Sequence, residues 1–210
     1  MDFEEVLNNR RSIRLYKQKI VERDKIYKII SAGILAPSAG NLQTWNFILV
    51  DDVDVKNQII TAAMQQDWMF NAQIIVICSN PENTKKFYGL RGEALYTVQD
   101  CAAAIENMLL EATNLGLGSC WIGAFDEKAV SRILKLPDNL RPQAIITVGY
   151  SDETPVMPVR YNLDGFVFHD EYGKRIIDEG FGLMEMAQKS KTKINKGGLL
   201  DKFKLKWKKE

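Results

Sequence analysis

Residues 100–125 read DCAAAIENMLLEATNLGLGSCWIGAF and hold most of the longest helical pattern in the chain, which runs from about Leu95 to Leu115. Apolar residues recur there at helical spacing: Val98, Ala102, Ile105, Leu109 and Ala112. The other side carries only a narrow polar stripe of Asp100, Asn107, Glu111 and Asn114. This stripe is too thin for an ordinary surface helix. The pattern therefore predicts a helix buried over most of its circumference, in the centre of a domain or against a partner subunit.

Strands and helices are expected to alternate on both sides of this helix. Three segments have helical spacing: residues 2–10, 23–36 and 126–134. Asp2 and Asp126 are the expected N-caps of the first and last of these. Three short runs are apolar and β-favouring: residues 45–50, 73–79 and 143–150. The order predicts a layered α/β or α+β domain.

Length and composition narrow the class of protein. The 210 residues, 46% of them hydrophobic, suffice for one sizeable core with appendages. No apolar run is long enough to span a membrane and the N-terminus lacks a secretory signal, so we expect a soluble, cytoplasmic protein without an integral membrane segment. Cys78, Cys101 and Cys120 lie in apolar sequence and are expected to be reduced core thiols.

The single histidine, His169, argues against the common zinc sites and leaves little room for a histidine-based triad. We therefore predict no metal site and no catalytic side chain: the chemistry is carried by something other than side chains.

The C-terminal region differs in charge from the rest of the chain. Residues 188–210 hold nine lysines against Asp201 and Glu210, so this tail is +7 and the remainder is −6. The tail is expected to be a solvated terminus; a surface-binding helix that docks to a membrane or an acidic partner is the alternative. The acidic body argues against nucleic-acid binding.

The strongest local signal is RRSIR at residues 10–14. In an extended chain, Arg10, Ser12 and Arg14 point to one side and alternate with Arg11 and Ile13. Two guanidinium groups and a hydroxyl match a phosphate group. The alternative interpretation is a solvated basic turn.

Two further segments are rich in small residues. PSAGNLQTW, residues 37–45, lies between an apolar helix and an apolar strand, and Ala39 and Gly40 would let a flat ligand come close. GLGSCWIGAF, residues 116–125, is not the dinucleotide fingerprint, because Trp121 stands where the third glycine belongs and no strand is expected before it. Each segment alone is also explained as a connecting loop.

Taken together and in order, these segments resemble the nitroreductase family of FMN enzymes. The resemblance rests on RRSIRLY, APSAGNLQTWNFILV, DCAAAIENMLLEATNLGLGSCWIGAF, and LRPQAIITVGY followed by PVMPVRYNLDGFVF, and covers roughly residues 3–173. It implies an α+β, three-layer fold with a mixed, mainly antiparallel sheet wrapped by helices. It also implies an interlocked homodimer with FMN in each of two interface clefts, wrapped by an extended segment at residues 151–173. We expect one domain over residues 1–175 and an extension over 176–210.

The resemblance also implies which residues bind the cofactor. Arg10, Arg11, Ser12 and Arg14 match contacts to the phosphate and the pyrimidine edge of the flavin. Pro37, Ser38, Ala39 and Asn41 match a loop that approaches the flavin from the other subunit. Ile122, Gly123 and Ala124 match the segment beside the reactive flavin edge, and Arg160 matches a late phosphate-binding arginine. Pro158 departs from a basic position found in several members, and residues 64–70 match nothing securely.

The implied activity is hydride transfer from NADH or NADPH through FMN to a small acceptor such as a nitroaromatic or a quinone, in a ping-pong cycle. Arg14 would give electrostatic support to the reduced flavin. Two alternatives stay open. One is a flavoenzyme with another acceptor, through enone reduction or reductive dehalogenation. The other is a flavin-binding module without turnover.

Overall fold

The computed structural model describes residues 1–64 and 66–174. The chain divides into two compact units between Met157 and Pro158. The first unit holds the sheet and its helices; the second, as far as Lys174, contains one short 3-10 turn, η4 (Leu163–Gly165). The domain boundary expected at residue 175 coincides with the end of the described residues and stays a prediction. The lysine-rich tail lies outside the described residues.

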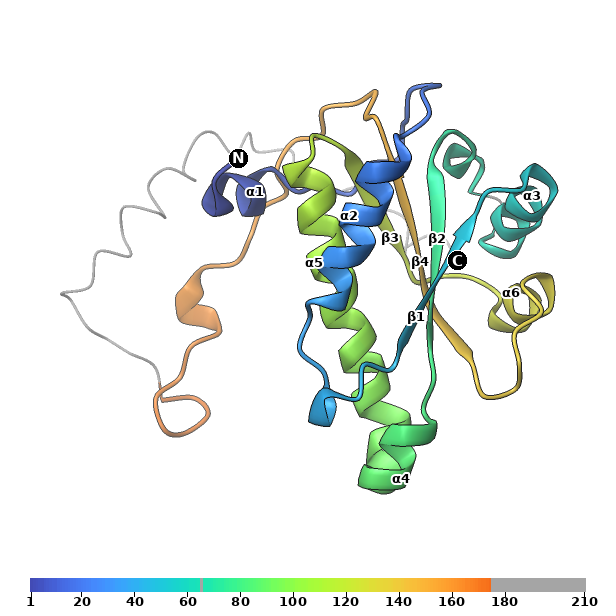
Figure 1. Cartoon of the computed structure of the whole chain (residues 1–210). Coiled ribbons are helices and arrows are strands. Elements are labelled where there is room, and N and C mark those ends of the chain that lie inside the picture. Colours follow the sequence, from blue (N-terminus) through green and yellow to red (C-terminus); the bar gives the residue numbers. More distant parts are fainter. Residues whose placement is uncertain (65, 175–210) are drawn as a thin grey trace, which may run out of the picture. The chain divides into compact units, whose positions relative to one another are not determined.

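Four antiparallel strands form the sheet of the first unit (Figure 1). They are β1 (Trp45–Val50), β2 (Gln73–Ser79), β3 (Gly118–Ile122) and β4 (Arg141–Gly149), in the order β1-β2-β4-β3. Every ladder between neighbouring strands is antiparallel. The one parallel pairing in the described part of the chain is an isolated bridge between Ser12 and Ser119. The expected α+β fold with a mainly antiparallel sheet is confirmed.

Helices cover both faces of this sheet. On one face lie α2 (Arg23–Ile34) and α5 (Thr97–Asn114). On the other lie α3 (Val53–Ala62) and α6 (Glu127–Ile133). The remaining helices are α1 (Phe3–Asn9), α4 (Glu82–Arg91), the short turns η1 (Ala39–Asn41) and η2 (Asp67–Asn71), and a π-helical turn, η3 (Gly92–Tyr96). The expected three layers are therefore present.

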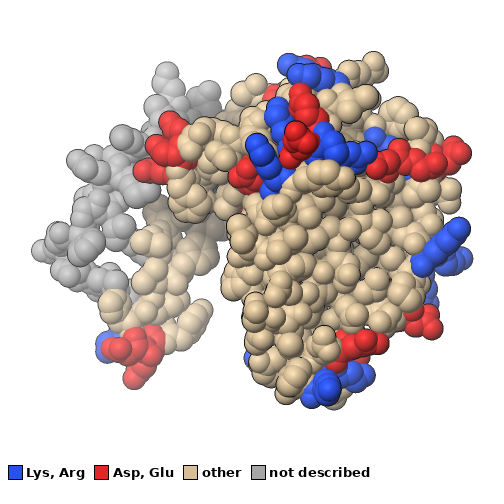
Figure 2. All heavy atoms as spheres, viewed as in Figure 1, with Lys and Arg blue, Asp and Glu red and all other residues tan. Residues whose placement is uncertain are grey.

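The outer side of α2 and α5 is poor in charge. Figure 2 shows this side as largely free of charged residues, which gather toward its margins. Apolar side chains are exposed on these helices: Tyr27, Ile34 and Val98. On α1, Phe3 and Leu7 are exposed as well, and Val6 is the one residue of this helix that is buried.

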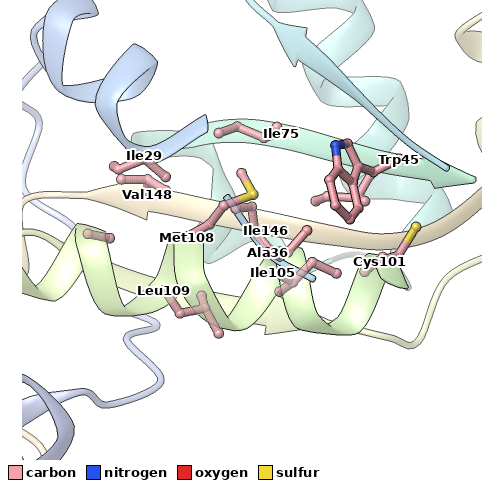
Figure 3. Packing of buried hydrophobic residues seen from close by; sticks show 14 of the residues in the cluster. Ile29, Ala36, Trp45, Ile75, Cys101, Ile105, Met108, Leu109, Ile146 and Val148 are labelled. Carbon is pink, nitrogen blue, oxygen red and sulfur yellow. The ribbon is translucent and has the colours of Figure 1, made fainter. Parts of the chain in front are cut away.

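The core is sorted by the alternation of side chains along the central strands. On β2, Ile75 and Ile77 pack in the cluster with α2 and α5, part of which Figure 3 shows. Ile74 and Val76 pack in the cluster with α3 and α6. Strands covered on both faces carry continuous apolar runs, which explains why β2 and β4 are recognisable from sequence. The three cysteines are free and buried, as expected.

The long helix departs from its prediction at two residues. Asp100, assigned to the polar stripe, is 4% exposed, whereas Val98, assigned to the apolar side, is 39% exposed. Asp100 shares a face with Ala104 and Met108, which are buried against the sheet and α2. The prediction that Asp100 is exposed was wrong because hydrophobicity alone places a carboxyl in solvent, whereas hydrogen bonds to residues far along the chain stabilise this one in the interior.

Three elements were missed from sequence: α3, α4 and β3. The α4 sequence ENTKKFYGLR is largely polar and shows no apolar stripe. The β3 sequence GSCWI begins with small residues of low β-propensity and becomes a strand through its pairing with β4. Residues 116–125 are therefore not a simple loop. Among the described residues, no helix is both long enough and apolar enough to cross a membrane.

Candidate functional site

Residues 10–16, here called the strap, lie along the edge of the sheet beside β3. The Ile13 amide donates to the Ser119 carbonyl at 2.9 Å, and Ser12 pairs with Ser119 in parallel orientation. Farther along, Tyr16 pairs with Ser151, and the Tyr16 hydroxyl bonds to the Thr147 hydroxyl at 2.9 Å. Ile13 and Tyr16 are buried, so the strap is fastened to the core through alternate side chains.

Two glycines let the strap come this close. A Cβ atom built on Gly118 would lie 2.7 Å from Ile13 Cγ1, and one built on Gly149 would lie 2.7 Å from Tyr16 Cδ1. Contacts this short force a neighbour to move. Gly118 and Gly149 therefore fix the distance between the strap and the sheet.

The strap presents donors to solvent. Ser12 and Arg14 are exposed on either side of buried Ile13, the alternation expected of extended backbone. Arg14 makes no side-chain hydrogen bond or ion pair within the described part of the chain. Arg10, by contrast, pairs with Glu106 at 3.5 Å, and Arg11 Nη1 donates to the Arg10 carbonyl at 2.6 Å.

The inner side of the strap is polar as well. Burial raises the pKa of the Cys120 thiol, and the nearby Arg14 charge and a hydrogen bond with Ser12 partly offset this rise. Burial also raises the pKa of the Tyr16 hydroxyl. The Ser119 hydroxyl is buried and has no hydrogen-bond partner among the described residues. Buried polar groups rarely lack partners, so this corner holds hydrogen-bonding capacity that the described chain does not use.

The end of β3 leaves backbone open. Ile122 is buried, but Gly123 and Ala124 are exposed. A Cβ atom built on Gly123 would meet nothing within 4 Å, so this backbone faces open space. Because the bridge between Ser12 and Ser119 is parallel, the strap and β3 run in the same direction here. Gly123 and Ala124 thus follow the strand that the strap pairs with, four and five residues beyond Ser119.

Residues 37–44, here called the loop, precede β1 at another corner. Pro37, Gly40 and Asn41 are exposed, and Ser38 and Ala39 are half-buried. The Ala39 amide donates to Asp100 Oδ1 at 2.9 Å, and the Thr44 hydroxyl donates to Asp100 Oδ2 at 3.0 Å. Sequence reasoning missed Asp100; the available signal was a carboxyl on the buried face of a helix.

The two corners are far apart within one chain. Trp45 is level with Ser79 and Arg141, whereas Ser119 pairs with Val148, seven residues farther along β4. Strand spacing and rise then separate the loop from the strap by about 14 Å across the sheet and about 23 Å along it. In Figure 1 the 39–41 turn lies at the lower end of α5 and α1 lies toward its upper end. No hydrogen bond or ion pair among the described residues joins residues 10–14 to residues 37–41.

The remaining expected site residue is Arg160. It lies in the second unit, in a stretch with neither helix nor strand, and its side chain is exposed. Two hollows of about 740 and 450 Å³ occur elsewhere on the first unit, one between α3 and α6 and one beside Lys56 and Phe70. Neither is lined by a residue expected to bind the cofactor.

Comparisons with known proteins agree with this architecture. The sequence pattern of the Nitroreductase family matches residues 7–66 and 57–150. An Archaeoglobus fulgidus protein named NADH dehydrogenase/NAD(P)H nitroreductase is 37% identical over 69% of this chain and 83% of its own. The Bacillus subtilis FMN reductase (NADPH) is 24% identical over 73% of this chain and 69% of its own. A solved nitroreductase family protein from Clostridium novyi, 32% identical, superimposes with a TM-score of 0.67 over 86% of this chain and all of its own. The chain belongs to the nitroreductase family.

Proposed function

We propose that this protein is an NAD(P)H-dependent oxidoreductase that binds FMN and works as a homodimer. The observation that carries the proposal is the strap corner. There, exposed Ser12 and Arg14 lie near Cys120, next to the buried Ser119 hydroxyl that has no partner among the described residues. The same strand leads on to the open backbone of Gly123. The names of the Archaeoglobus and Bacillus relatives support the nicotinamide donor and the flavin.

The residues at this corner fit a flavin mononucleotide. Arg11 and Arg14 offer positive charge, and the Ser12 and Ser119 hydroxyls offer further donors for a phosphate or for the polar edge of a ring. Gly123 and Ala124 would lie along a flat ring system, since their small side chains leave the backbone accessible. Arg10 would join them only on leaving Glu106. Arg160 stays a predicted phosphate contact.

Bound FMN would supply the redox chemistry, accepting hydride from NADH or NADPH and passing it to a small acceptor such as a nitroaromatic or a quinone in a second step. The chain's own residues would position the group and shape its electrostatics. Arg14, which has no side-chain partner among the described residues, would favour the anionic reduced form through its positive charge. No side chain is required to donate or accept a proton in this proposal.

A second copy of the chain would complete the site. The loop and the strap lie at diagonally opposite corners, too far apart for one small ligand to touch both within a chain. A two-fold dimer repeats every contact, so the loop of each protomer could reach the strap of the other. The outer side of α2 and α5, poor in charge in Figure 2, supports such an interface. It exposes Tyr27, Ile34 and Val98, and exposed apolar surfaces mark association sites. Residues 154–162 form neither helix nor strand, and Val156 and Val159 are 89% and 91% exposed, as expected of an arm that packs against a partner.

The test is an absorbance spectrum of the purified protein after incubation with FMN, followed by anaerobic addition of NADH and then NADPH. We expect a protein-bound flavin band at about 450 nm that bleaches with at least one donor. Adding a nitroaromatic, a quinone, an enone or a halogenated aromatic to the reduced protein then identifies the acceptor class that restores the band.

Two other outcomes contradict parts of the proposal. A bound flavin that neither donor reduces would point to a flavin-binding module without turnover. Protein that retains no flavin after gel filtration would overturn the assignment of FMN.

A further inference from the structure

We propose that Asp100 is a positioning residue for the flavin site: its carboxyl group fixes the shape of the 37–44 loop that each protomer presents to its partner's flavin. The inference rests on the proposed function for the flavin and the dimer. The anchoring of the loop itself stands on contacts within one chain.

Asp100 is a buried carboxyl whose two oxygens serve two parts of one loop. Oδ1 accepts from the Ala39 amide at 2.9 Å and Oδ2 accepts from the Thr44 hydroxyl at 3.0 Å. Asp100 and Thr44 are each 4% exposed, and no ion pair in the described part of the chain includes Asp100. Hydrogen bonds from the loop therefore replace the water that a buried carboxyl loses, and those bonds are charge-assisted.

The loop needs such an anchor because its backbone is unusual. Asn41 and Gln43 have φ values of 56° and 49°, in the left-handed region that side chains disfavour, and Gly40 joins them at 56°. A left-handed conformation is unfavourable for a residue with a Cβ atom, more so for glutamine than for asparagine. Two such residues within three positions persist only where the surroundings hold them.

Other contacts shape the middle of the loop but do not tie it to α5. The Gln43 amide donates to the Ser38 hydroxyl at 3.0 Å, which closes the loop on itself. The Tyr88 hydroxyl sits so close to Gly40 that a Cβ atom there would lie 2.6 Å away. Asp100 holds both ends of the loop and connects them to the longest helix. Its loss frees the residues expected to contact the flavin, Ser38, Ala39 and Asn41.

Three substitutions separate anchoring from general stability. Asp100→Ala leaves the Ala39 amide and the Thr44 hydroxyl without an acceptor. Asp100→Asn keeps the shape: its amide oxygen can accept from Ala39 while its amide nitrogen donates to the Thr44 hydroxyl. Thr44→Val removes one of the two bonds and keeps the volume.

Thr97→Val is the matched control for Thr44→Val. Thr97 is also buried, lies one turn from Asp100 on α5, and donates one hydrogen bond, to the Glu93 carbonyl at 2.8 Å. That bond stays within the helix and does not touch the loop. Both variants lose a buried hydroxyl bond, and only Thr44→Val loosens the loop.

The experiment measures the dissociation constant of FMN by flavin fluorescence for the whole protein, and amide hydrogen exchange at Ala39 and Gln43 in the flavin-free protein. We expect Asp100→Ala to raise the dissociation constant at least tenfold and to speed exchange at both amides. Asp100→Asn should stay within about threefold of wild type. Thr44→Val should raise the dissociation constant more than Thr97→Val does, at an equal loss of unfolding free energy.

The outcomes distinguish this inference from the proposed function. Unchanged exchange at Ala39 and Gln43 in folded Asp100→Ala would overturn the anchor, whatever the protein binds. Faster exchange with unchanged flavin affinity would keep the anchor and reject its role in the site. A wild-type protein that binds no FMN would overturn the proposed function and the flavin role of Asp100, and exchange would still decide the anchor. Equal effects of Thr44→Val and Thr97→Val on flavin binding would also reject the positioning role.

Discussion

The strap and the loop reach their positions by different physical means. The strap is held by packing: Ile13 and Tyr16 are buried, backbone hydrogen bonds join it to the sheet edge, and Gly118 and Gly149 allow close contact. The loop lies between buried Ala36 and Trp45 and is tied to the neighbouring helix by the two hydrogen bonds of the Asp100 carboxyl. Packing fixes the strap through close apolar contacts, whereas the polar anchor of the loop depends on each hydrogen-bonding group keeping its partner. The comparison teaches that one site can rest on two independent supports, each of which can be broken alone.

The largest expected effects are on FMN binding, when Arg14 of the strap and Asp100 beneath the loop are substituted in different chains. Arg14→Ala should raise the FMN dissociation constant roughly 10- to 150-fold, since a hydrogen bond to a charged group contributes about 1.5–3 kcal/mol.

If strap and loop meet across a dimer, co-expressing Arg14→Ala chains with Asp100→Ala chains creates mixed dimers with one intact site each. About a quarter of all sites should then bind FMN with wild-type affinity. Titration of the co-expressed protein with FMN measures that fraction.

Two differently tagged Arg14→Ala chains provide the control, because every site in that mixture lacks the guanidinium. Recovery in the test mixture alone supports a site shared between chains. No recovery, with mixed dimers verified by a double-tag purification, would mean that the strap and the loop of one chain serve the same ligand.

The second largest effect is a loss of stability, expected when a side chain is added at Gly118 beneath the strap. In Gly118→Ala the added methyl would overlap Ile13 Cγ1, and overpacking of this kind lowers the free energy of unfolding by about 1–3 kcal/mol. Gly123→Ala, where the added methyl meets nothing, should leave stability within about 0.5 kcal/mol of wild type. Urea unfolding of the two variants makes the comparison. Equal stabilities would show that the strap yields easily and that packing does not fix its position.

Sequence alone predicts the strap better than the loop, because the strap follows a local pattern and the loop depends on polar partners far along the chain. The alternation of Ser12, Ile13 and Arg14 is local, so extended backbone and one buried position follow from spacing. The role of Asp100 depends on partners 61 and 56 residues away, and nothing in a helical pattern encodes them. The β3 strand was missed because it begins with Gly118 and Ser119, small residues of low β-propensity. Gly118 is needed there because the strap comes too close for a side chain. The central strands and the long helix were predictable because elements buried on most sides consist almost entirely of apolar residues.

The smallest effect concerns the strap at alkaline pH. Burial raises the pKa of Tyr16 above its ordinary value of 10.0, so the hydroxyl loses its proton more readily in the unfolded chain. The contribution of Tyr16 to stability is therefore complete below about pH 10 and declines as the pH rises above it. Tyr16→Phe loses the bond to Thr147 and should destabilise the protein by about 1 kcal/mol at pH 8. By pH 10.5 this difference should shrink by about 0.8 kcal/mol.

Urea unfolding at the two pH values tests this expectation. Cys78 and Cys101, whose pKa values burial raises to about 12, also lower stability as the pH rises, but they are common to both proteins and cancel in the difference. A Tyr16→Phe difference that stays constant would mean that Tyr16 titrates alike in both states. The strap would then be less firmly buried than its contacts with Gly149 and Thr147 indicate.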